Sequence, residues 1–89
     1  MKAVVTVIGE DRVGIIAKVS ACLADYSINI LDINQTIMGN LFTMIMMVDT
    51  KDMPCKFFEI SEKMEKLGDE LGVKILMTQE EIYKSMHRI

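Results

Sequence analysis

The chain has 89 residues, of which 51% are hydrophobic, and a formal net charge of −3 at pH 7. This length suits one domain covering residues 1–89 and is too short for two. The negative charge argues against a broad attraction to nucleic acid or to an acidic membrane surface. Small domains bury a limited share of their surface, so this apolar content suggests that a second copy of the chain covers part of it.

The start of the chain and its cysteines point to a cytoplasmic protein without a membrane segment. Met1-Lys2-Ala3 leads directly into a β-type run, without the cleavage-site pattern of a signal peptide. The longest apolar run, residues 44–48, has the length of a strand and not of a membrane span. Cys22 and Cys55 lack Cys-x-x-Cys spacing, so we interpret them as reduced, apolar residues of the interior.

A strand and a helix open the chain. Residues 2–8 are rich in β-branched types and predict a mostly buried strand. The loop 9–14, GEDRVG, follows, and its Asp11 is a candidate N-cap for the next helix. One helical stripe then repeats at spacings of four, three and four: Ile15, Val19, Cys22 and Tyr26.

A β-hairpin occupies the middle of the chain. From residue 30 the pattern alternates, with Ile33 and Ile37 on one face and polar residues between them. Gly39-Asn40 supplies the turn. Residues 41–48 are apolar at both parities, which predicts a central strand covered on both faces.

A second helix, a fourth strand and a terminal helix complete the pattern. Pro54 suits a first helical turn with Asp52 as its cap, and Gly72 provides the stop. The apolar positions between them repeat at three and four: Phe57, Ile60, Met64, Leu67 and Leu71. Residues 73–77 predict a strand, and Thr78-Gln79-Glu80-Glu81 has the spacing of a capping box that opens the last helix.

The order βαββαβ predicts an α+β, ferredoxin-like sandwich over residues 1–78, with a short C-terminal helix over 79–89. Such an order folds as a four-stranded antiparallel sheet with two helices on one face. Right-handed crossovers place the first and third strands in the centre. The second face of the sheet stays open unless the terminal helix or another subunit covers it.

The residues argue against several chemistries that this fold supports. The loop lacks a phosphate-binding signature, and its two acids would repel a phosphate. The single histidine, His87, lies near the C-terminus without a catalytic set, and no metal-ligand cluster or cofactor is indicated. An RNA-binding sheet needs aromatic residues on its central strands, where this chain has only Phe42.

An acylphosphatase-type site remains an alternative because that family uses the same element order. Arg12, with Asn29 or Asn34, would supply its arginine and asparagine. The sequence GEDRVGI does not match that family's phosphate-cradling loop, so no catalytic residue is assigned.

The stretch GEDRVGIIAKVSACLADYSINILDI resembles the first half of an ACT domain, a regulatory module that typically binds amino acids. The shared features are the D-R-x-G-I turn, the S-I-N-I start of the second strand and the hairpin QTIMGNLFTMIMMVD. The resemblance covers nearly the whole chain. It is greatest to the stand-alone, single-domain ACT proteins of bacteria and archaea.

The resemblance implies a ligand site. In amino-acid-binding members, a polar loop residue, the loop glycine and an Asn-Ile pair contact the ligand, often from two subunits whose sheets meet edge to edge. The matching positions are Asp11, Gly14, Asn29 and Ile30. Each also has a structural interpretation, such as an N-cap at Asp11 or close packing at Gly14, and these alternatives stay open.

The chemistry of an α-amino acid suits these positions. Free backbone N–H groups at the helix start, around Val13, Gly14 and Ile15, favour a carboxylate. Asp11 or the side-chain carbonyl of Asn29 could accept from an ammonium group. Arg12 is either a clamp on the ligand or a solvated charge.

The sequence therefore predicts a homodimeric regulatory module that binds an amino acid or a similar metabolite. It has no catalysis and no cofactor of its own, so regulation would pass through a partner protein. The alternative is a dimerisation module that docks a partner without sensing a ligand. An acylphosphatase-like enzyme is the third choice.

Overall fold

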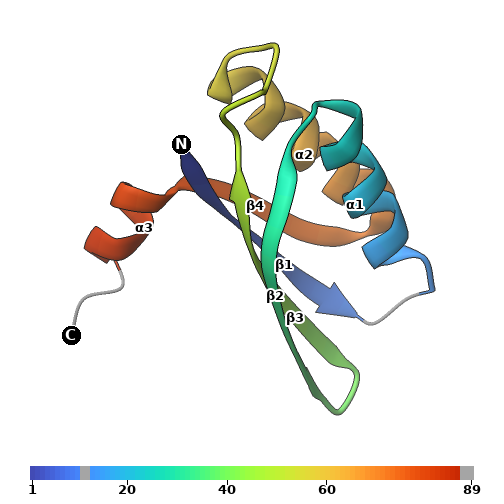
Figure 1. Ribbon diagram of the computed structural model, residues 1–89. Coiled ribbons are helices and arrows are strands. Elements are labelled where there is room, and N and C mark those ends of the chain that lie inside the picture. The colour runs from blue at the N-terminus through green and yellow to red at the C-terminus, as the bar shows by residue number, and fades with distance from the viewer. Residues whose placement is uncertain (11–12, 87–89) are drawn as a thin grey trace.

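A computed structural model describes residues 1–10 and 13–86 of the chain (Figure 1). Its elements, in chain order, are β1 (Lys2–Glu10), α1 (Ile15–Asp25), β2 (Asn29–Met38), β3 (Leu41–Asp49), α2 (Phe57–Leu71), β4 (Val73–Gln79) and α3 (Glu80–Met86). This arrangement confirms the α+β, ferredoxin-like sandwich with a short C-terminal helix. Strand β4 runs directly into α3, which begins at Glu80.

The four strands form one antiparallel sheet in the order β2-β3-β1-β4. The first and third strands are central, as predicted, and β2 and β4 are the edges. Helices α1 and α2 lie together on one side of the sheet, and the β2–β3 hairpin extends beyond them (Figure 1). Its residues 31–41 are all exposed.

The hydrophobic core fills the space between the sheet and these two helices. Alternate residues of the central strands point into it, such as Val5 and Val7 of β1 and Met44 and Met46 of β3. From the helices, Val19, Leu23, Ile60 and Met64 meet them and are fully buried. The predicted apolar stripes of both helices are therefore the faces that pack on the sheet.

The two helix starts differ from the sequence-based predictions. Helix α1 begins at Ile15, and Gly14 occupies its N-cap position at φ 91° without a side-chain hydrogen bond. The N-cap predicted at Asp11 is therefore wrong, and Asp11 itself lies outside the described residues. Helix α2 begins at Phe57 with Lys56 as N-cap, so the cap predicted at Asp52 is wrong. The chain still turns at Met53, whose N–H donates to the Thr50 carbonyl (3.1 Å).

The C-terminal end of α2 matches the prediction. Gly72 follows the last residue of α2 at φ 75°, and its N–H points to the carbonyls of the last turn. Glycine adopts this left-handed conformation without the steric cost that other residues meet.

The face of the sheet away from α1 and α2, which we call the open face, is covered at one end only. Val4 points to this face and is 2% exposed. Helix α3 contacts β1 and β4 there and lies on the side of the sheet opposite α1 and α2 (Figure 1). Ile45 of β3 is 37% exposed on the same face. Strand β3 is therefore fully covered on only one of its two faces, and the prediction of cover on both faces is wrong within one chain.

We expect Gly68→Ala to destabilise the fold by about 1–3 kcal/mol, as overpacking does. A Cβ at Gly68 would lie 2.7 Å from the Val73 carbonyl oxygen and 3.1 Å from Ile75 Cγ1. This clash outweighs the gain in helix propensity, which is about 1 kcal/mol. Urea unfolding measures the difference, with the exposed Glu65→Ala variant of the same helix as control. A Gly68→Ala variant as stable as the wild type would contradict this packing.

Candidate functional site

The turn between β1 and α1 is open to solvent at the positions that the sequence singled out. Val13 is fully exposed, and Gly14 is partly exposed in a left-handed conformation. Apart from its two chain neighbours, no atom of residues 1–10 and 13–86 would lie within 4 Å of a Cβ built on Gly14. Among these residues, Gly14 is therefore required by the left-handed backbone conformation of the turn and not by packing, and they leave the space beside it open.

Ile15 has a different environment from its neighbours. Its side chain is 2% exposed and belongs to the core, so only its backbone could meet a ligand. The first N–H groups of a helix have no partner within the helix, and the first helical bond of α1 runs from the Lys18 N–H to the Gly14 carbonyl (3.0 Å). The N–H groups before Lys18 include those of Val13, Gly14 and Ile15, at which the sequence predicts that an anion binds. Asp11, Arg12 and His87 lie outside the described residues.

The S-I-N-I motif forms the end of α1 and the start of β2. Ser27 takes a left-handed conformation at φ 57°, and the Ile28 N–H donates to the Leu23 carbonyl (3.0 Å). Ile28 is buried, Asn29 is exposed, and Ile30 packs partly against the core. The turn thereby holds the Asn29 side chain in solvent at the first position of the edge strand.

Within one chain, the two halves of the predicted site lie at opposite ends of α1. Val13, Gly14 and Ile15 stand at its start, whereas Asn29 and Ile30 follow its end. The 11 residues of α1 span about 16 Å at 1.5 Å per residue. The sheet register agrees, because Asn29 is level with Lys2 at the start of β1, through Asp49 of β3.

Strand β2 is an edge strand with few of the features that prevent pairing with another strand. Its sequence, NILDINQTIM, contains one charge and no proline. Ile33 and Ile37 point to the helix side of the sheet, yet they are 40% and 56% exposed. A β-bulge interrupts the register between Ile30 and Asp32, which leaves residues 33–38 as a regular edge.

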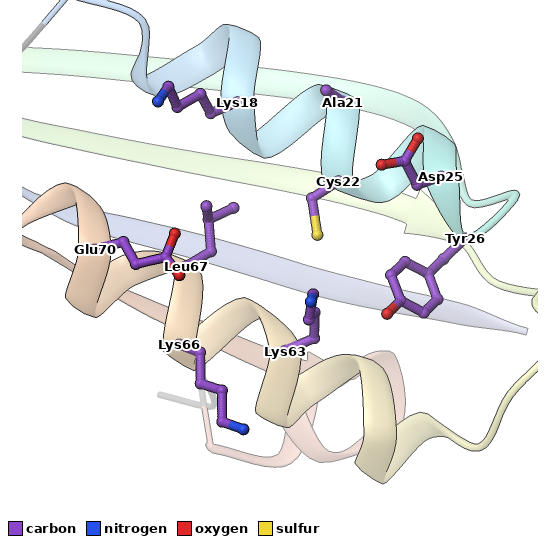
Figure 2. A pocket seen from close by; sticks show the side chains of 9 residues that line it. All are labelled: Lys18, Ala21, Cys22, Asp25, Tyr26, Lys63, Lys66, Leu67 and Glu70. Atoms are coloured by element: carbon purple, nitrogen blue, oxygen red, sulfur yellow. The ribbon is translucent and has the colours of Figure 1, made fainter.

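A second concave surface, the α1–α2 groove, lies between the two helices and has a volume of about 410 Å³. Its lining residues are Lys18, Ala21, Cys22, Asp25, Tyr26, Lys63, Lys66, Leu67 and Glu70. Figure 2 shows that the Cys22 thiol and the Lys63 side chain point toward each other across it. These residues come from two helices that are distant in the sequence and form no motif, so no local pattern predicts the groove.

The environment of the Cys22 thiol favours its protonated form, because its pKa is raised. Burial raises its pKa, nearby Asp25 adds to the rise, and the Lys63 ammonium opposes it. A thiol in this state is a poor nucleophile. Among residues 1–10 and 13–86, no group of three or more histidine, cysteine or acidic side chains could hold a metal ion. In the same part of the chain, none of the helices is long and apolar enough to cross a membrane.

The fold and the glycine turn define a small α+β module of the ferredoxin-like class. The family model described as ACT domain matches residues 2–78, so the chain belongs to the ACT-domain family. ACT domains are commonly regulatory modules that bind small molecules. This match therefore indicates a regulatory domain and not a known enzyme.

Three similar proteins illustrate this relationship. A UPF0237 protein of Methanocaldococcus jannaschii is 51% identical over 88 residues, which cover 99% of this chain and 98% of the relative. The solved structure of an ACT domain protein from Streptococcus pneumoniae is 38% identical, with a TM-score of 0.82 and 94% of each chain covered. The ligand-free regulatory subunit of aspartate kinase from Thermus thermophilus is 28% identical, with a TM-score of 0.66 over 85% of this chain and 49% of that chain.

We expect the alkylation of Cys22 to need a higher pH than that of an unburied cysteine, because burial raises its pKa. Replacing Lys63 with Gln removes the charge that lowers this pKa, so the alkylation midpoint should move further up. The rates at which iodoacetamide alkylates Cys22 between pH 7 and 10, followed by peptide mass spectrometry, measure both effects. Lys51→Gln, outside the groove, is the control. A midpoint that falls in Lys63→Gln would contradict the described groove.

Proposed function

We propose that the protein is a homodimeric regulatory module that binds an amino acid between two copies of the chain. Each site would combine the β1–α1 turn of one copy with the start of β2 of the other. The observation that carries the proposal is the separation of Gly14 from Asn29 within one chain, together with the edge position of β2.

Pairing two β2 edges in antiparallel fashion would bring the two halves together. Strand β2 runs in the same direction as β1, so the β1–α1 turn lies at the Met38 end of β2. An antiparallel partner strand would place its own Asn29 at that end. A two-fold axis would therefore generate two equal sites, each with residues of both copies.

The exposed side chains of β2 favour this pairing. Ile33 and Ile37 would be covered by the second copy, which removes apolar surface from water. The unpaired N–H and C=O groups of residues 33–38 would complete their hydrogen bonds across the new edge. The result would be one continuous eight-stranded sheet with four helices on one side.

The chemistry of the site would match both charges of an amino acid. The helix start at Gly14 and Ile15 offers N–H groups and the positive end of the helix dipole to the carboxylate. The Asn29 carbonyl would accept from the ammonium group. The open space beside Gly14 would admit the ligand close to the backbone.

Regulation would follow from the shared site. A ligand that binds only the paired state stabilises that state by its binding free energy. The amino acid would thus control the assembly, and a protein partner would respond to it. The aspartate kinase structure noted above shows this fold in a regulatory subunit.

We also propose a cytoplasmic location. Cys22 and Cys55 are both free, and unpaired thiols in a small domain suit a reducing compartment.

The common amino acids, screened at millimolar concentration by thermal shift, test this function. A ligand at 100 times its Kd should add about 2.7 kcal/mol to the free energy of unfolding. Asn29→Ala should abolish the effect without changing the assembly, whereas Ile33→Lys should abolish both pairing and binding. Phe58→Lys, which changes a more exposed apolar residue on α2, should change neither.

If none of the amino acids stabilises the protein, the sensing function is wrong and the docking-module alternative takes its place. If Ile33→Lys retains full binding as a monomer, the shared site is wrong.

A further inference from the structure

The uncovered part of the open face carries a compact apolar patch. In the register, Ile45, Thr6 and Leu76 lie side by side across β3, β1 and β4, and Thr43, Ile8 and Lys74 form the next row. The three large apolar side chains of these rows are Ile8, Ile45 and Leu76, which are 39%, 37% and 45% exposed. We call these three residues the sheet patch.

Helix α3 has a second apolar surface on its outer side. Glu80 and Tyr83 are partly buried toward the sheet, beside the covered Val4. On the side of the helix away from Glu80, Ile82 and Met86 are one turn apart and are 52% and 68% exposed. We call Ile82 and Met86 the helix strip, and it lies next to the sheet patch. Among the described residues, neither surface covers the other.

We propose that this surface binds a second copy of the chain, with the open faces of the two copies turned toward each other. The α3 helix of each copy would lie on the sheet patch of the other, beside that copy's own α3. Each open face would then be covered by two helices. One would lie over Val4 and one over the sheet patch.

The dimensions of the face fit this arrangement. The middle of the sheet patch is three residues along β1 from Val4, about 10 Å at 3.3–3.4 Å per residue. Packed helices lie about 8–10 Å apart, so a second helix fits next to α3 on the same face. The seven residues of α3 span about 10 Å, comparable to the width of the β3–β1–β4 part of the sheet. A two-fold axis would place the helix strip of each copy on the sheet patch of the other copy, so the contact is self-complementary.

The charges around the two surfaces are also complementary. Lys74 is the charged residue in the two rows of the sheet patch, and Glu81 is exposed on the outer side of α3. Neither belongs to the ion pairs found in residues 1–10 and 13–86, which join Met1 to Asp49 and Lys84 to Glu80. Glu81 of each copy can therefore meet Lys74 of the other. The acidic residues Glu80 and Glu81 of α3 and the net charge of −3 disfavour an acidic membrane as the partner of this surface.

This interface is separate from the edge pairing of the proposed function. It uses α3 and the open faces of β1, β3 and β4, whereas the edge pairing uses the backbone and helix-side residues of β2. The two contacts can occur together, in which case the assembly contains four chains.

The molar mass of the assembly in solution, measured by light scattering, tests the interface. Ile82→Lys and Leu76→Lys each place an ammonium group in the contact, so each should halve the mass of the wild-type assembly. Phe58→Lys is the matched control on the opposite layer and should leave it unchanged. This halving is expected whether or not the β2 edges pair. Amino-acid binding by Ile82→Lys should be retained, which separates the result from a failure of the proposed function.

A charge exchange tests the predicted contact between Glu81 and Lys74. Glu81→Lys and Lys74→Glu should each weaken association, and the double variant should regain the wild-type mass. The proposal is overturned if folded Ile82→Lys has the wild-type mass. It is equally overturned if the double charge variant associates no better than the single variants.

Discussion

The packing of both crossover helices on the same face of the sheet is the constraint on which the rest of the structure depends. Right-handed crossovers leave α1 and α2 no other side, and the buried contacts of residues such as Val19 and Met64 with the central strands hold them there. One face becomes the core of the domain, while the other keeps only α3 over one end. A chain with 51% hydrophobic residues therefore retains apolar side chains in solvent on β2, on the open face and on α3.

The same constraint divides the candidate site. Because α1 must run back along the sheet before β2 can begin, the glycine turn and Asn29 stand at its two ends. Pairing of the β2 edges would remove this separation, because the exposed Ile33 and Ile37 would be buried there and the direction of β2 matches a two-fold partner. The open face is a different surface with different residues, and we propose a different contact for it. The edge pairing would make the ligand site a property of two chains and not of the single chain.

Periodicity in the sequence was sufficient to predict the element order, the central strands and the glycine stop at Gly72, because burial on one face imposes a regular spacing. The helix starts were not predictable in the same way. Asp11 and Asp52 are good capping residues, but α1 and α2 begin at Ile15 and Phe57 without side-chain caps, where contacts with the sheet decide. The two-sided apolar pattern of residues 41–48 predicts cover on both faces, whereas one of these faces is partly open within one chain. The α1–α2 groove joins Cys22 to Lys63, and no local pattern reports such a long-range contact.

Mixing two variants tests the shared site most directly. Gly14→Val and Asn29→Ala each remove one half of every site, so each should fail to bind the amino acid that stabilises the wild type. In a mixed dimer, one site carries both changes and the other carries neither. Calorimetry on an equal, re-equilibrated mixture should then recover about a quarter of the wild-type binding sites, because half of the dimers are mixed and each has one intact site. A mixture that binds no more ligand than either variant alone would contradict a site built from two copies.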